Sequence, residues 1–133
     1  MKHQASGTFE VAIQMQGEAD NAGGVSLGRM SLDKKFTGDL QAVGKGEMLS
    51  ARSAVEGSAG YVAIERVTGT LQGRQGSFVF QHTGVMNRGE SQLSITVVPD
   101  SGTEELTGIA GEFLLTIQDG KHHYIFTYSL PEA

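Results

Sequence analysis

Apolar and polar residues alternate with a period of two along most of this chain, and this alternation limits the folds open to it. In residues 8–16, TFEVAIQMQ, the side chains of Phe9, Val11, Ile13 and Met15 share one face, and mostly polar residues occupy the other. A period of two is the pattern of a β-strand with one buried face. No window keeps the 3.6-residue period of an amphipathic helix. The sequence therefore predicts an all-β protein.

Eight strands are expected in the 133 residues of the chain. Segments rich in glycine, asparagine, aspartate and serine separate them, and these residues favour turns. The expected strands are residues 8–16, 25–35, 40–51, 61–70, 76–82, 92–98, 106–117 and 122–130. Residues 18–24 and 52–60 are expected to be loops by composition.

The short connections favour antiparallel pairing between strands that follow one another along the chain. Eight such strands can close into a barrel, and closure removes the exposed edges of the sheet. The 19 glycines are about twice the usual share, which suits turns and tight bends of a coiled sheet. We therefore predict a single domain, residues 1–133, folded as a closed antiparallel barrel of about eight strands with a mostly meander order.

The charges and the absence of cysteine restrict the partners and the location that we expect. Without cysteine the chain can form no disulfide and no thiolate metal site. Its formal net charge is -5 and its lysines and arginines are scattered, so we expect no nucleic-acid partner. The first residues contain no long apolar run, and the second faces of the strands are polar. We therefore expect no signal peptide, no membrane partner and a cytoplasmic location.

Two ionisable residues, Glu65 and His82, fall on the apolar face of a predicted hairpin. If Gly73 and Arg74 form the centre of its turn, Glu65 lies directly opposite His82. Opposed residues on one face have Cβ atoms roughly 5 Å apart, so the carboxylate and the imidazole can form a hydrogen bond. Aromatic residues share this face, which favours it as the interior of the barrel.

A carboxylate beside an imidazole can perform general acid–base catalysis. Under this hypothesis Glu65 is a general base or charge stabiliser, and His82 is its proton partner. The ligand would be bound by Tyr61, Phe78, Phe80 and Tyr124. The pair can equally be structural, with each residue satisfying the other and fixing the strand register. The sequence leaves both interpretations open.

Two further motifs carry no predicted site. His122 and His123 are adjacent, so on a strand they point to opposite faces, and we predict no metal site. Ser26 lies in GVSLG, the G-x-S-x-G pattern of hydrolase nucleophiles. That pattern needs a strand, a sharp turn and a helix, whereas an alternating strand follows here.

Three segments of the chain are similar to a bacterial family of unknown function: GYVAIERVTGTLQGRQGSFVFQHTGVM, VVPDSGTEELTGIAGEF and YIFTYSLP. That family resembles the plant allene oxide cyclases in fold. The resemblance implies a closed antiparallel barrel that assembles as a homo-oligomer. It also implies chemistry on a flexible, mostly apolar substrate inside the barrel, without a cofactor. No catalytic residue of the plant enzymes can be matched to a position of this sequence.

Three functions therefore remain open. An isomerase or cyclase-like enzyme would convert a small apolar or amphipathic molecule in the barrel interior. A carrier or sensor would bind such a molecule without changing it. An assembly module would have a filled interior, because a barrel of eight strands has room for one small ligand or for side chains only.

Overall fold

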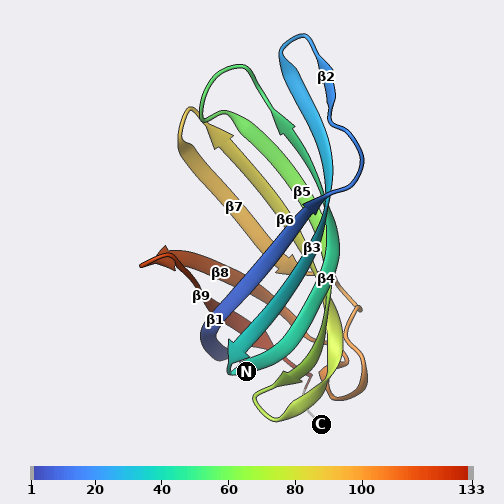
Figure 1. Cartoon of the computed structure of the whole chain (residues 1–133). Helices are drawn as coiled ribbons and strands as arrows, with labels where there is room; N and C mark the ends of the chain where they lie inside the picture. The colour runs from blue at the N-terminus through green and yellow to red at the C-terminus, as the bar shows by residue number, and fades with distance from the viewer. Residues whose placement is uncertain (1, 132–133) are drawn as a thin grey trace.

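Nine antiparallel strands form one sheet in the computed structural model, which describes residues 2–131 (Figure 1). The strands are β1 (Lys2–Met15), β2 (Asp20–Ala22), β3 (Val25–Gly38), β4 (Leu40–Arg52), β5 (Ala59–Leu71), β6 (Arg74–Asn87), β7 (Glu90–Val97), β8 (Ala110–Gln118) and β9 (Lys121–Ser129). A 3-10 turn, η1 (Glu104–Leu106), precedes β8. The described residues contain no α-helix, as the alternating pattern predicted.

β1 closes the sheet into a barrel, because it pairs with β9 along one edge and with β3 along the other. Gly7 of β1 pairs with Gly38 of β3 on one side and with Tyr124 of β9 on the other, so the sheet closes at this residue. A Cβ on Gly7 would lie 2.1 Å from the carbonyl oxygen of Thr37, and only glycine permits that approach. Eight strands form the ring in meander order, and β2 extends β3 outside it. The prediction of a closed eight-stranded barrel is confirmed.

Several predicted boundaries differ from the structure. β6, for example, runs from Arg74 to Asn87 rather than from residue 76 to residue 82. β1 begins at Lys2 rather than at residue 8, because its first part buries only the small side chain of Ala5 and shows little apolar alternation. The segment 18–24, expected to be a loop, contains the short strand β2. The strand expected from residue 106 starts at Ala110, because η1 and Gly108, with a φ of 83°, interrupt the extended chain.

The hairpin of β5 and β6 has a different register from the predicted one. The turn is centred on Gln72 and Gly73, whose φ angles are 46° and 86°, and not on Gly73 and Arg74. Two positive φ angles are the requirement of a type I′ turn, which suits a two-residue hairpin. As a result Glu65 pairs with Phe80, and Ala63 pairs with His82. The pairing shifts by two residues, so every side chain keeps its predicted face.

One end of the barrel is filled with aromatic rings, and we call it the aromatic end. All six phenylalanines of the chain are buried there or next to it, together with two tyrosines: Phe9, Phe36, Phe78, Phe80, Phe113, Phe126, Tyr124 and Tyr128. The connection between β7 and β8 adds Leu106 and Ile109 to this core.

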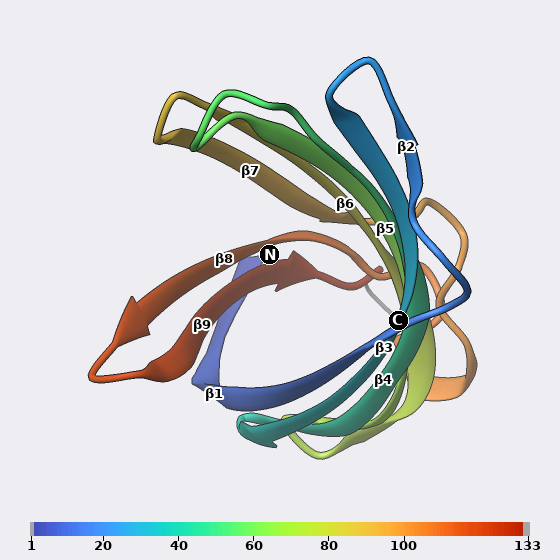
Figure 2. The same cartoon turned by 45° about the horizontal axis from the view of Figure 1, so that its top comes forward.

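The opposite end, next to β2, is the β2 end. The first residues of β1 and the last residues of β9 lie at the other end of the barrel, far from β2 (Figure 1). With the β2 end turned forward, β3 to β7 curve around one side, and β1, β8 and β9 lie around the other (Figure 2).

Candidate functional site

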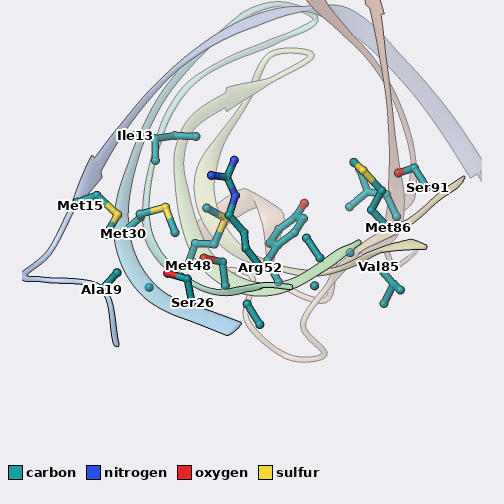
Figure 3. Close-up of a pocket in the computed structure, with 18 residues that line it drawn as sticks. Ile13, Met15, Ala19, Ser26, Met30, Met48, Arg52, Val85, Met86 and Ser91 are labelled. Carbon is teal, nitrogen blue, oxygen red and sulfur yellow. The ribbon is translucent and has the colours of Figure 1, made fainter. Parts of the chain in front are cut away.

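A pocket of about 600 Å³ lies at the β2 end (Figure 3). Its walls come from residues of β1, β3, β4, β5, β6 and β7, most of them inward-facing, and from Ala19. Apolar side chains such as Ile13, Val85 and Leu93 line it, and Ser26, Ser50 and Ser91 add hydroxyl groups. Sites for small molecules have volumes of roughly 300–1,000 Å³ and mostly apolar walls. The pocket at this end of the barrel falls within that range of volume and has a mostly apolar lining.

Methionines dominate one wall of the pocket. Met15 pairs with Met30, and Met30 pairs with Met48, so three thioethers form a row across β1, β3 and β4. Met86 on β6 lies on the other side of the pocket (Figure 3). Methionine is unbranched and polarisable, so such a wall can adapt to ligands of different shape.

Tyr61 brings a polar group into this apolar wall. The Tyr61 ring packs over Gly84, the residue that pairs with Tyr61 on β6. A Cβ added to Gly84 would lie 2.3 Å from a ring carbon of Tyr61. Burial raises the pKa of the Tyr61 hydroxyl above its ordinary value, and the negative charge of Glu65 raises it further. Tyr61 therefore stays protonated near neutral pH and can donate a hydrogen bond to a ligand.

Below the pocket, three charged or ionisable side chains meet inside the barrel. Glu65 is 0% exposed, His82 4% and Lys34 8%. Lys34 Nζ donates to Glu65 Oε1 at 3.2 Å, and His82 Nε2 lies 2.9 Å from the same oxygen. We call these residues the buried cluster. The predicted contact between Glu65 and His82 is confirmed, although the two residues are diagonal neighbours rather than a directly opposed pair.

The second carboxylate oxygen of Glu65 has no hydrogen-bond partner among the described residues. Gly44 on β4 makes room for it, because an added Cβ would lie 2.4 Å from Oε2. A buried oxygen without a partner is unusual in a folded protein. It gives the buried cluster one free acceptor inside the barrel.

The buried cluster lies deeper than the residues that line the pocket. On β6, His82 is the next inward-facing residue after Gly84, which lines the pocket. On β5, Ala63 separates Glu65 from Tyr61, and Ala63 is 3% exposed. The buried cluster is thus a neighbour of the pocket along the barrel axis. His82 is adjacent to the pocket lining, and Ala63 lies between that lining and Glu65.

The four predicted ligand-binding residues lie in two different parts of the barrel, the pocket and the aromatic core. Tyr61 lines the pocket, whereas Phe78, Phe80 and Tyr124 lie in the aromatic core and line no part of it. The Tyr124 hydroxyl donates to the carbonyl of Thr37 at 2.8 Å and accepts from the amide of Leu40 at 3.0 Å. These contacts attach β9 to the turn between β3 and β4, which is a structural role. Only Tyr61 of this set is placed to contact a ligand in the pocket.

Two features of the site were not identified from the sequence. Lys34 falls on the same strand face as Leu32 and Phe36, and both of these are buried. A lysine between two apolar residues at a period of two indicates a buried cation with a partner. Arg52 is the last residue of β4 and lies at the mouth of the pocket. No alternation of apolar residues around Arg52 in the sequence indicates this position.

No group of three or more His, Cys, Asp or Glu side chains in residues 2–131 comes together as a possible metal site. In the same residues, no helix has the length and apolar character needed to cross a membrane.

The family of the chain follows from two comparisons. The model of a family described as "Protein of unknown function (DUF3224)" matches residues 5–128. A crystal structure of a protein with unknown function from the DUF3224 family of Shewanella oneidensis MR-1 is similar, with 50% sequence identity and a TM-score of 0.95. The similarity covers 100% of both chains. No curated protein matches the chain. The chain belongs to the DUF3224 family, in agreement with the resemblance seen in its sequence.

Proposed function

We propose that this DUF3224 protein binds a small apolar or amphipathic molecule in the pocket at the β2 end. The observation that carries the proposal is the pocket of about 600 Å³ with its methionine wall. Transfer of apolar ligand surface from water into such a site is favourable by roughly 25 cal/mol per Å². Tyr61 supplies a hydrogen-bond donor that can orient the ligand. This function requires the cavity and not the ionisation of the buried cluster.

Filling the pocket should abolish binding. Ser50 faces the pocket from β4, and Ser50→Phe would place a ring in the space that the ligand needs. We expect this variant to bind the fluorescent apolar probe N-phenyl-1-naphthylamine at least about tenfold more weakly than the wild type, a loss of about 1.4 kcal/mol. A fluorescence titration measures the affinity.

Ser94→Phe is the matched control, since Ser94 is exposed on β7 and pairs with Thr83 away from the pocket. Its affinity should equal that of the wild type. Equal affinities for the wild type and Ser50→Phe would place the probe elsewhere and remove the pocket from the proposal. Circular dichroism checks that both variants are folded.

A second candidate is an isomerase or cyclase-like enzyme, and the free acceptor of Glu65 favours it. Glu65 would act as general base or charge stabiliser, and His82 would relay the proton. No described residue that lines the pocket belongs to the buried cluster. A substrate would therefore have to pass Tyr61 and then Ala63 before its reacting atom reached the carboxylate.

Incubation of a ligand recovered from the purified protein separates the two candidates. An enzyme should convert the recovered molecule to an isomer that chromatography and mass spectrometry detect. Glu65→Gln and His82→Gln should each slow that conversion by about 100-fold or more, the usual contribution of a general acid or base. An unaltered ligand after incubation with the wild type would favour the carrier.

Assembly as a homo-oligomer stays a prediction. On the outer face of β5, Val62 is 50% exposed and Ile64 is 53% exposed, and Arg66 lies on the same face. Apolar residues beside arginine are common where subunits meet.

A further inference from the structure

We infer that the pocket selects molecules that combine an apolar body with one anionic group, and that Arg52 binds this group. The inference rests on the proposed function, because it concerns the ligand of the same pocket.

The first support is the charge of the pocket lining. Arg52 is the one charged side chain among the described residues that line the pocket, and no aspartate, glutamate, lysine or histidine lines it. The whole chain has a formal net charge of -5, so this cation does not belong to a generally basic protein. The pocket is thus complementary to a single negative charge within an otherwise uncharged lining.

Within residues 2–131, Arg52 has no acidic partner, which is the second support. The ion pairs within residues 2–131 join Arg29 to Glu47, Lys45 to Asp33, and Glu65 to Lys34 and His82. Arg52 takes part in none of them. A guanidinium carries five N–H donors in a planar arrangement that matches carboxylate, sulfonate and phosphate groups. A ligand anion can therefore use these donors without breaking an existing ion pair.

The third support is the position of Arg52. It ends β4 at the mouth of the pocket and pairs with Ser26 of β3, whose hydroxyl also lines the pocket. In Figure 3, the guanidinium of Arg52 lies between two walls of the pocket, one with Met15 and Met30 and the other with Met86. An anionic group at Arg52 would stay near water, while the apolar body of the same molecule would contact the methionine wall.

The buried cluster offers no competing anion site. Lys34 is 8% exposed, and its ammonium group already donates to Glu65 at 3.2 Å. An anion that moved deeper would lose water and meet the carboxylate of Glu65, which is unfavourable. Arg52 is therefore the group that would fix the orientation of the ligand, with its charged end outward.

Two dyes that differ by one charge test the inference. N-Phenyl-1-naphthylamine is uncharged, and 1-anilinonaphthalene-8-sulfonate has the same ring system with one sulfonate. Arg52→Gln should weaken binding of the sulfonate dye by roughly five- to tenfold, the effect of one charge-assisted contact near water. Its affinity for the uncharged dye should change by less than about twofold. Arg52→Lys should recover part of the loss, because it restores the charge without the planar donor set.

Arg66→Gln is the control, since it removes the same charge from an exposed residue of β5 that does not line the pocket. It should leave both dye affinities unchanged. Equal effects of Arg52→Gln on both dyes, or no effect on the sulfonate dye, would overturn the inference while the proposed function stands. Failure of the wild type to bind either dye would overturn both.

Discussion

Replacement of Glu65 by glutamine is expected to lower the free energy of unfolding by about 3–5 kcal/mol, the usual cost of leaving a buried charge without its partner. The Glu65 carboxylate is fully buried and contacts Lys34 at 3.2 Å and His82 at 2.9 Å. Glutamine keeps the size of the side chain and removes its charge. The ammonium group of Lys34 then remains inside the barrel without a counter-charge. Urea unfolding followed by circular dichroism measures the change.

The double variant Lys34→Met with Glu65→Gln should recover most of that loss, because it removes the unpaired charge as well. Glu47→Gln is the matched control, since Glu47 is 64% exposed and pairs with Arg29 on the outer face. An exposed ion pair contributes less than about 1 kcal/mol. If Glu65→Gln were as stable as the wild type, or if the double variant were less stable than Glu65→Gln, the buried cluster would not hold a charged pair.

Phe126→Ala is expected to lower the free energy of unfolding by about 3–5 kcal/mol through loss of a buried ring and creation of a cavity. The Phe126 side chain is 0% exposed at the centre of the aromatic end. Its ring centroid lies 5.3 Å from those of Phe80 and Tyr128 and 5.7 Å from that of Phe78. Strands β6 and β9 are held together across the barrel by these contacts. The same urea unfolding experiment measures the loss.

Ile125→Ala tests whether the loss depends on the direction of the side chain. Ile125 is the preceding residue on β9, points outward and is 43% exposed. Its truncation should cost less than about 1 kcal/mol, as is usual at the surface. A larger loss for Ile125→Ala than for Phe126→Ala would contradict the strand register of β9.

The contact between Glu65 and His82 was predictable although the predicted turn was displaced. Both residues lie on the apolar face of their strands, and that face depends only on the period of two. The true turn at Gln72 and Gly73 shifts the pairing by two residues, which preserves the face. The side chains are long enough to meet diagonally, so the error in register did not change the outcome.

The contact of Glu65 with Lys34 could not be predicted in the same way. Lys34 is on β3 and Glu65 is on β5, so the two side chains meet across β4, at Gly44. Nothing in the local pattern of either strand records how far the intervening strand is shifted. The sequence indicates that Lys34 points inward, and only the pairing of three strands shows what it contacts.

The sequence by itself determined which side chains face the interior, because the direction of a strand residue follows from its parity along the strand. It determined in the same way that the chain is all-β and that its strands can close into a barrel. Only the tertiary structure decided the height of each inward residue along the barrel axis, since strand tilt and stagger set that height and neither is a local property. For this reason Tyr61 lines the pocket, while Phe78, Phe80 and Tyr124, which also face inward, fill the aromatic end.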